Sequence, residues 1–570
     1  MKTLSLIVGL TIVLWCSPLW AATYYIDPSC SSNGDGTTTS CGTNGPFKGW
    51  SEVTWAPGNT YAQKGGTTWY GTITVGASGT AAAPITITSY GTGMANLSGL
   101  ITVSAWTAND PVSGTYSTPS VSGYAWYEDG VPLLYGSRAS SLTPGQVYWN
   151  SGAKNYYVPT TATPSSHTIQ ATLCDGIYIG SNNYITINNL SFLKYAEAIG
   201  NLVGGPHPSG LCNTGITVTN CTFDDVGWAV NIINNNAMSS AINISNNNIS
   251  YAGNSIELGA MGTGYYSNCT IANNQILYCS EKEGSNNLWR IQNGGYHYTF
   301  WYYDSEGIGT QNLNSSSINN NIITGDCRGI VHYVFSGSNG NNNNFYKNYI
   351  NVAQDALQFS SESGATFYNN SAYYNILDGG EYDSQYSGGW NVALLLTSPS
   401  TLSGTNYIYN NDIISGGNLC IVGTSTVLGN YNIENNIILG SNLSMLSSLI
   451  YIPGTTNLVF NRNLWYPTTN SKVSTYEWYV GSAHDTFAQW QAVGFDVSPT
   501  PSPADPLFDN TSGSLSQPRD FMIGDKSPAK GAGISVGLTS DYIGTTVSNP
   551  PSIGAYEFSL APVTGLKIEH

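Results

Sequence analysis

The chain has 570 residues, of which only 9% are charged and 12% are aromatic, and its formal net charge is −17. This acidic balance argues against nucleic-acid binding, which needs clustered Lys and Arg, and against a polyanionic sugar unless a cation bridges the charges. A low-charge chain rich in Gly, Asn, Ser, Thr and Tyr is instead typical of a long β-structure that satisfies its own backbone hydrogen bonds.

Residues 1–22 have the pattern of a secretory signal peptide. Lys2 precedes an apolar run over residues 4–14, and small residues at Ala21 and Ala22 offer a cleavage site. No later stretch is long and apolar enough to span a membrane. We therefore expect a secreted protein that is extracellular or periplasmic and has no membrane span.

Two segments precede the regular part of the chain. Residues 23–99 alternate short strands with Gly turns, and we interpret them as an N-terminal cap and first coils that cover an otherwise open edge. Cys30 and Cys41 bracket a polar loop there and form the best candidate disulfide. The remaining cysteines contain no CxxC pair, which argues against a zinc site. Residues 100–168 break the pattern with Tyr- and Trp-rich strands, which indicates an inserted antiparallel module.

Residues 169–497 carry a repeat that predicts the architecture. An Asn, replaced once by Lys347, recurs between two short apolar runs every 22 to 47 residues, a period typical of stacked repeats. Asn tolerates the left-handed backbone of a sharp bend, and its amide can bond to an identical amide one layer away. The pattern predicts an all-β solenoid with an Asn ladder, whose bends we place at Asn189, Asn220, Asn246, Asn273, Asn320, Asn369, Asn410, Asn435 and Asn461.

Two intervals of the repeat are too long for one coil, those from 273 to 320 and from 369 to 410. Both are rich in aromatic residues, and long loops on a rigid scaffold often carry function. Exposed rings near acids favour sugar stacking over loop packing. The candidate substrate-binding residues are Trp289, Tyr298, Trp301, Tyr303 and Trp390. The repeat is followed by residues 498–570, a closing segment that starts with a Pro-rich spacer.

The two ends of the mature chain resemble a known group of proteins. Residues 24–28 (Tyr-Tyr-Ile-Asp-Pro), 33–36 (Asn-Gly-Asp-Gly) and 84–91 look like the start of secreted right-handed parallel β-helix proteins of the pectate-lyase-like superfamily. Residues 526–529 (Lys-Ser-Pro-Ala) and 553–557 (Ile-Gly-Ala-Tyr-Glu) look like their closing segment. The resemblance implies a right-handed parallel β-helix. It does not imply one reaction, because the superfamily includes lyases, hydrolases, epimerases, esterases and adhesins.

Counting from the Asn positions predicts which residues of different coils lie side by side. Eight residues past each bend a small-apolar pair should begin the next strand, which stacks neighbours about 4.8 Å apart. One predicted column contains Asn254, Glu306, Arg328 and Asp355. Three residues further along, a second column on the outer face contains Asn231, Glu257, Gly309, Val331 and Gln358.

The candidate catalytic residues are therefore Glu257, Glu306, Arg328 and Asp355. A glycoside hydrolase needs one carboxylic acid and one carboxylate, and Glu306 could pair with Asp355 or, more closely, with Glu257. A polysaccharide lyase would use Arg328 as base or charge neutraliser, and the three acids could bind Ca²⁺. The scarcity of basic residues slightly favours a hydrolase.

Two other interpretations stay open. The acids and Arg328 could form a salt-bridge ladder between coils without catalytic function. His332 should point inward by strand alternation, as a core histidine does. The alternative function is that of a non-catalytic carbohydrate-binding or adhesive surface protein.

Overall fold

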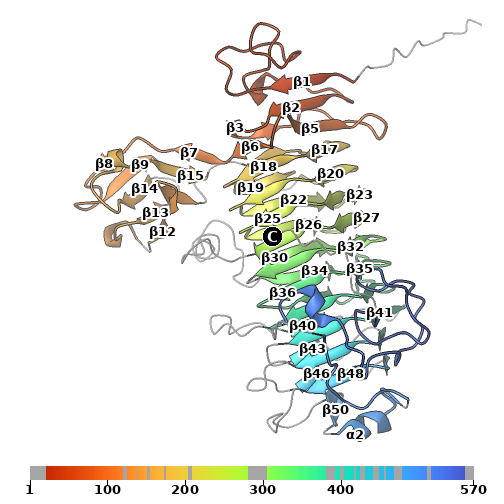
Figure 1. Cartoon of the computed structure of the whole chain (residues 1–570). Coiled ribbons are helices and arrows are strands. Elements are labelled where there is room, and N and C mark those ends of the chain that lie inside the picture. The colour runs from red at the N-terminus through yellow and green to blue at the C-terminus, as the bar shows by residue number, and fades with distance from the viewer. Residues whose placement is uncertain are drawn as a thin grey trace, which may run out of the picture.

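A computed structural model describes residues 21–119, 125–136, 138–150, 154–172, 175–202, 208–279, 305–325, 327–380, 392–397, 404–415, 419–423, 430–440, 448–454, 457–467, 478–484, 486–497, 499–509 and 515–558. The chain winds into a tall stack of coils (Figure 1), and each regular coil contributes one strand to each of three long sheets. The predicted right-handed parallel β-helix is confirmed. None of the described helices is long and apolar enough to cross a membrane.

Sheet 1 contains the strands that precede each Asn bend, all in parallel register. In spatial order they are β1 (Thr23–Ile26), β2 (Thr60–Lys64), β5 (Ile85–Tyr90), β17 (Ile185–Asn188), β20 (Ile216–Thr219), β24 (Asn243–Ser245), β28 (Thr270–Ala272), β32 (Ser317–Asn319), β35 (Asn344–Tyr346), β38 (Ser371–Tyr373), β41 (Thr405–Tyr409), β44 (Asn430–Glu434) and β47 (Leu458–Asn461).

Sheet 2 contains the strands that follow each bend. They are β3 (Thr68–Tyr70), β6 (Ala95–Ser98), β18 (Leu190–Leu193), β21 (Thr222–Asp224), β25 (Asn248–Ser250), β29 (Gln275–Cys279), β33 (Ile322–Gly325), β36 (Tyr349–Val352), β39 (Ile376–Gly379), β42 (Asp412–Ser415), β45 (Ile437–Gly440) and β48 (Leu464–Pro467).

Sheet 3 completes each coil and carries the predicted catalytic residues. Its strands are β4 (Ile73–Thr74), β16 (Ile177–Tyr178), β19 (Glu197–Gly200), β22 (Trp228–Asn235), β26 (Asn254–Met261), β30 (Glu306–Gln311), β34 (Arg328–Val334), β37 (Leu357–Ser361), β40 (Val392–Thr397), β43 (Leu419–Gly423), β46 (Ser448–Ile452), β49 (Trp478–Val480) and β50 (Ser482–His484). A short fourth sheet of β23 (Met238–Ser240), β27 (Tyr265–Ser267) and β31 (Leu313–Asn314) widens three coils.

The bend between sheets 1 and 2 takes a left-handed residue in each regular coil. Most are Asn with φ between 52° and 58°, as at Asn220 and Asn189. Two predicted positions are wrong, because Tyr374 replaces Asn369 and Arg462 replaces Asn461. Asn369 bends the chain before sheet 1 instead, where a second amide ladder makes an Asn pair look the same in the sequence.

The ladder itself is built by the residue after each bend. The amide of Asn247 donates to Asn274 Oδ1 at 3.0 Å and to the carbonyl of Val218 at 3.0 Å. Its own oxygen accepts the backbone N–H of Cys221 at 3.0 Å, so the buried amide is well satisfied. The pattern repeats through Asn247, Asn274, Asn321, Asn348, Asn375, Asn411, Asn436 and Asn463, each at most 2% exposed.

The interior between the three sheets is filled by stacked apolar side chains. Ile, Val, Leu and Phe of successive coils form one continuous core. The rings of Phe192 and Phe223, for example, stack with centroids 4.8 Å apart. Each fully buried side chain of this size contributes about 1.5–3 kcal/mol relative to exposure. The core therefore fixes which face of every strand points outward.

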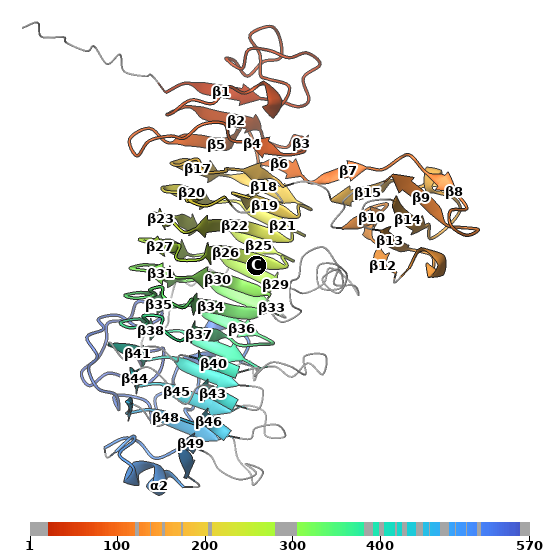
Figure 2. The same ribbon diagram turned by 180° about the vertical axis from the view of Figure 1, so that it is seen from behind.

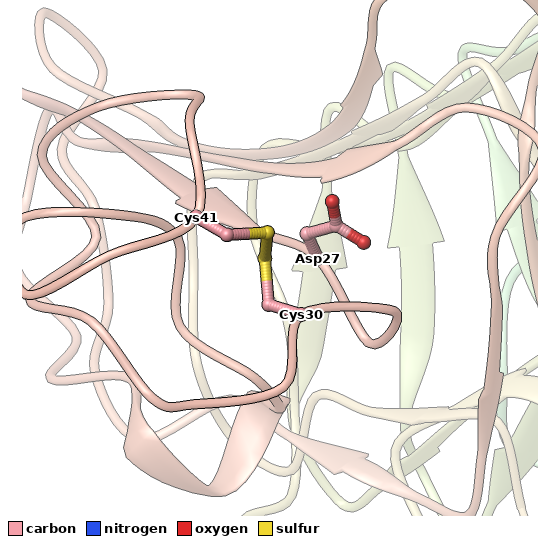
Figure 3. Close-up of side chains that lie close together, drawn as sticks. All are labelled: Asp27, Cys30 and Cys41. Atoms are coloured by element: carbon pink, nitrogen blue, oxygen red, sulfur yellow. A yellow bond between two sulfur atoms is a disulfide. The ribbon is translucent and has the colours of Figure 1, made fainter.

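The N-terminal end contains the predicted disulfide. Cys30 and Cys41 are bonded, beside the buried carboxylate of Asp27 (Figure 3). Asp27 accepts hydrogen bonds from Lys64 and Ser29. Burial by itself would raise the pKa of the Asp27 carboxyl, but these hydrogen bonds outweigh it and the pKa is lowered. This cluster holds the first coils together. It is no metal site, because both sulfurs are consumed by the disulfide.

An inserted module protrudes from the side of the upper coils (Figures 1 and 2). It has one sheet of β7 (Leu100–Thr102), β10 (Trp126–Glu128), β11 (Val131–Pro132) and β15 (Ile169–Thr172), and a second of β8 (Thr107–Ala108), β9 (Tyr116–Pro119), β12 (Leu134–Tyr135), β13 (Gln146–Asn150) and β14 (Lys154–Val158). Its pairings are antiparallel except that of β12 with β13. Two short 3₁₀ turns, η2 (Ala139–Ser141) and η3 (Pro164–Ser166), complete it.

The module is fixed to the helix by a buried polar contact. Tyr127 donates its hydroxyl to Asp225 Oδ2 at 2.9 Å, and Lys194 Nζ lies 2.8 Å from the same oxygen. The Lys194 ammonium also lies 4.1 Å from the centre of the Tyr127 ring. Because Asp225 and Tyr127 are buried, this contact holds the module in one orientation against the corner of sheets 2 and 3.

The last part of the chain covers the helix in two ways. Helix α2 (Phe487–Ala492) closes the lower end by packing Trp490 against Phe460, Trp465 and Trp478. The chain then returns along the outside of sheet 2, where Phe521 and Tyr556 join an apolar cluster with Tyr349 and Ile376. Figure 1 shows this segment in blue beside the lower coils, with the short turn η4 (Pro518–Phe521). The turn η1 (Trp50–Glu52) lies near the opposite end.

A carboxylate ends the Asn ladder. Asp496 Oδ1 accepts from the backbone N–H and amide of Asn463 at 2.9 and 3.1 Å. Its Oδ2 accepts from the indole N–H groups of Trp465 and Trp490 at 2.8 and 3.0 Å. Four donors meet here, and a carboxylate can accept them all because it has two acceptor oxygens and no donor.

We expect Asp496→Asn to destabilise the lower coils, because the amide must point its NH₂ at one of these pairs of donors. An unsatisfied buried donor costs about 1–3 kcal/mol. Thermal unfolding should show a lower midpoint for Asp496→Asn, and hydrogen exchange should locate the loss in β47, β48 and α2. Asp509→Asn, the same change at an exposed position, is the control; equal midpoints for the two variants would contradict the prediction.

Candidate functional site

All the large insertions between sheets 2 and 3 leave the helix at the same corner. The module lies between β6 and β16, residues 280–304 lie between β29 and β30, and residues 381–391 lie between β39 and β40. The corner therefore borders the start of every strand of sheet 3. The aromatic residues predicted to bind substrate, Trp289, Tyr298, Trp301, Tyr303 and Trp390, fall outside the described residues.

The predicted columns exist on sheet 3. Asn231 pairs with Glu257, Glu257 with Gly309, Gly309 with Val331, and Val331 with Gln358. Glu306 pairs with Arg328 in the other column, and Asn254 Oδ1 accepts the backbone N–H of Glu306 at 3.0 Å. The register predicted from the Asn spacing is therefore confirmed across these coils, whereas the roles of the residues stay predictions.

Glu306 and Glu257 converge above one glycine. A Cβ on Gly309 would overlap Glu306 Oε2 and would lie 3.8 Å from Glu257 Cδ. The Glu306 carboxyl thus folds over the bare backbone of its own strand, toward the neighbouring coil. That same position lies 3.2 Å from Glu306 Cδ, so the two carboxyl groups are close neighbours. Carboxyl groups of glycosidases are roughly 5–5.5 Å apart in retaining enzymes and roughly 6.5–9.5 Å apart in inverting ones.

Each acid of this pair has a different second neighbour. Arg328 Nη1 lies 4.0 Å from Glu306 Oε1, and the two side chains are 20% and 16% exposed. Glu257 Oε1 instead lies 3.5 Å from the amide nitrogen of Gln311, whose oxygen accepts the backbone N–H of Ala260. Glu306 therefore has a cationic neighbour, whereas Glu257 has an amide.

Asp355 lies further down the same column and is buried. Its Oδ1 accepts the backbone N–H of Val392 at 3.1 Å, which holds the start of β40. Burial raises its pKa, and Arg328 and the Val392 N–H oppose that rise. Arg328 therefore acts electrostatically on Glu306 and Asp355, as its position between them in the column predicts.

The column also contains an acid that the sequence reasoning did not propose for the site. Glu197 folds over Gly200 as Glu306 folds over Gly309, and Asn231 Nδ2 donates to its Oε2 at 3.1 Å. Burial, Asp175 and Glu257 raise its pKa well above the usual value, against the bond from Asn231. The signal was in the sequence, because Glu-Ala-Ile-Gly at 197–200 matches Glu-Gly-Ile-Gly at 306–309.

The inward-facing residues of these strands do not join the site. His332 is fully buried, lies near Phe345, Phe359 and Phe367, and has a pKa lowered by burial to about 4. Its Nδ1 lies 3.2 Å from the hydroxyl of Thr310. His332 is therefore a neutral core residue at neutral pH, as strand alternation predicts.

A stacked aromatic pair, of which Tyr278 is exposed and Tyr251 is half-buried, lies at the corner beside the site. Tyr251 and Tyr278 occupy the same left-handed position in successive coils, and their rings stack at 4.9 Å with an interplanar angle of 10°. Tyr278 is 45% exposed, and in the next coil the register shifts so that Gly325 pairs with Cys279. The corner therefore presents the ring of Tyr278 next to the strands of Glu257 and Glu306.

The tightest group of possible metal ligands with two carboxylates lies in the inserted module and not at the candidate site. Among the described residues, the cluster of Glu128, Asp129 and His167 in the module brings three ligand atoms together, whereas Glu257, Glu306 and Asp355 do not form such a group. His167 Nδ1 lies 2.7 Å from Asp129 and 3.1 Å from Glu128. His167 thereby connects two segments of the module. This geometry lends no support to Ca²⁺ bound by the three acids alone.

The comparisons with known proteins agree with the fold. No protein-family model matches the sequence, and no curated protein matches it either. The structure of XylC in complex with xylose matches with a TM-score of 0.56 at 12% identity, covering 94% of this chain and 98% of XylC. At this identity the likeness shows the fold alone, and it agrees with the parallel β-helix expected from the sequence.

Two further solved structures match less closely. Pectate lyase Pel9A aligns with a TM-score of 0.40 and 13% identity over 94% of this chain and 96% of its own. The PL6 family alginate lyase AlyGC aligns with a TM-score of 0.37 and 11% identity over 89% of this chain and 57% of its own.

Asp175, whose charge acts on Glu197, offers a test of the electrostatics beside the site. Burial raises its pKa from 3.8 to about 6, so the folded chain holds a proton that the unfolded chain releases. The free energy of unfolding should therefore fall as pH rises through this interval and level off above it. Urea unfolding across this pH range should show this fall in the free energy of unfolding for the wild type and not for Asp175→Asn. Identical pH profiles of the two proteins would contradict the prediction.

Proposed function

We propose that the protein is a carbohydrate-active enzyme that hydrolyses an extracellular polysaccharide on the outer face of sheet 3. The observation that supports this most is the convergence of Glu257 and Glu306 over Gly309. Two neighbouring carboxyl groups are what glycosidic cleavage requires. A secreted location suits a polymeric substrate, and XylC, which shares the fold, was solved with xylose.

The neighbours of the two acids suggest their roles. Glu306, beside Arg328, attacks the anomeric carbon as a carboxylate. Glu257, which has an amide rather than a guanidinium beside it, gives its proton to the leaving glycosidic oxygen as that bond breaks. Water, deprotonated by Glu257, then cleaves the glycosyl ester on Glu306. Two displacements retain the anomeric configuration.

The remaining predicted residues support the pair. Arg328 keeps Glu306 ionised, and Asp355 positions Arg328 and β40 without touching the reacting atoms. Trp289, Tyr298, Trp301, Tyr303 and Trp390 belong to the two insertions at the corner and are proposed to stack on sugar rings there. Tyr278, exposed at the same corner, adds a ring that the sequence reasoning missed.

Incubation with a polysaccharide panel, with and without a chelator, tests the reaction. A hydrolase releases reducing ends alone, whereas a lyase also produces an unsaturated uronate that absorbs in the ultraviolet. We expect reducing ends only, with retention seen by proton NMR. Glu306→Gln and Glu257→Gln should each lower kcat by at least about 10²-fold with little change in thermal unfolding. Binding without any product would support the adhesive alternative instead.

Gly309→Ala tests the geometry without removing either acid. Its Cβ would occupy the position of Glu306 Oε2, so the carboxyl must swing away while the fold loses little. Misplacing a reacting group by about 1 Å can cost about 10²-fold, and we expect a loss of that order in kcat. Gly337→Ala, at a glycine with open space around it, is the control, though its φ of 74° costs some stability. Full activity in Gly309→Ala would contradict the assignment of Glu306.

A further inference from the structure

Acceptor atoms on the outer face of sheet 3 lack donors. Glu197 Oε1, Asn231 Oδ1 and Gln358 Oε1 are shielded from solvent and have no hydrogen-bond partner within the structure described. The nitrogen of each amide is occupied, since Asn231 Nδ2 donates to Glu197 and Gln358 Nε2 donates to Ser360 at 2.7 Å. Leaving a shielded polar atom unpaired costs free energy. Such atoms also occur elsewhere, as at Asn234 and Asp412, but these three lie together on one face of sheet 3.

The three atoms flank the proposed catalytic pair on both sides. Asn231 is one coil above Glu257 in the same column, and Gln358 is two coils below Gly309. Glu197 reaches the column from its own strand by folding over Gly200. Successive positions of the column are about 4.8 Å apart, so the row of unpaired acceptors runs along the helix axis through the site.

A hydroxyl group is the ligand that matches these positions. It donates to an unpaired carbonyl or carboxyl oxygen, and it also accepts from an N–H if either amide is turned the other way. A carboxylate ligand can only accept, so it could not satisfy Asn231 Oδ1 or Gln358 Oε1, whose amide nitrogens are already occupied. Sugar hydroxyls therefore match this row, and a uronate carboxylate does not.

The charge on the outer face of sheet 3 also favours a neutral sugar over a uronate. Glu257 and Glu306 are the acidic groups on it, whereas burial, Asp175 and Glu257 raise the pKa of Glu197 and so favour its uncharged form. Among the described strands of sheet 3, Arg328 is the only Lys or Arg, and it is next to Glu306. An anionic sugar unit placed above or below the pair would meet like charge without a neutralising partner.

We propose that sheet 3 binds a neutral polysaccharide along the helix axis, with sugar hydroxyls bonded to Glu197 and Asn231 on one side of the cleavage point and to Gln358 on the other. The cleavage point rests on the function proposed above, whereas the binding row does not. Glu197 is thus a substrate-binding residue, and the row selects neutral sugars over uronates.

Binding to an immobilised glycan array, followed by calorimetry, tests this with Glu306→Gln, which binds without turnover. The panel contains neutral oligosaccharides such as xylo-, manno- and gluco-oligosaccharides, and oligogalacturonate and oligomannuronate. We expect binding to a neutral member and none to the uronates. Asn231→Ala and Gln358→Leu should each weaken it roughly threefold to tenfold, as expected for one lost hydrogen bond. Thr217→Ala on the outer face of sheet 1 is the matched control and should bind as the parent does.

The outcomes separate this inference from the proposed function. If wild type binds a neutral glycan through Asn231 and Gln358 but releases no product, hydrolysis fails and the binding row stands. If the wild type cleaves a uronate polymer, the protein is carbohydrate-active and the neutral specificity is wrong. Unchanged affinity in both variants with normal unfolding, or no binding to any neutral glycan, overturns the inference.

Discussion

One repeated interaction holds this protein in register, the hydrogen bond from a buried Asn amide to the identical amide of the next coil. It runs from Asn247 to Asn463 and ends on the carboxylate of Asp496. Each amide also donates to a strand carbonyl, so a shift of one residue would leave buried donors and acceptors unpaired in every coil. The ladder therefore makes the register of all three sheets a shared constraint.

The proposed site is a consequence of that register. Glu257 and Glu306 are 49 positions apart in the chain, with a long insertion between them. Fixed stacking brings their strands together, and Gly309 lets one carboxyl lie across the backbone toward the other. The module and the two insertions all connect a strand of sheet 2 to a strand of sheet 3, so none of them interrupts the bend that carries the ladder. A rigid scaffold thus carries an acidic face beside a corner that tolerates added chain.

The sequence allowed much of this arrangement to be predicted, for particular reasons. The columns of Glu306 with Arg328 and of Glu257 with Gly309 followed from counting, because the ladder keeps the offset between bend and strand constant. Asn369 was misplaced because a second ladder at another corner produces the same Asn pair. Asn461 was misplaced by one residue, because Arg462 adopts the left-handed bend that Asn more often occupies. Glu197 was not proposed for the site, although its motif repeats that of Glu306.

By itself the sequence determined the β-helix, the cysteine pair at Cys30 and Cys41, and which residues share a column, because these depend on periodic local patterns and spacing. Only the tertiary structure decided which acids approach one another. That depends on how far each side chain leans over its strand, on a glycine leaving room beneath it, and on which shielded oxygens find no donor. None of these is a property of spacing, since each arises from atoms that meet only after the coils have stacked.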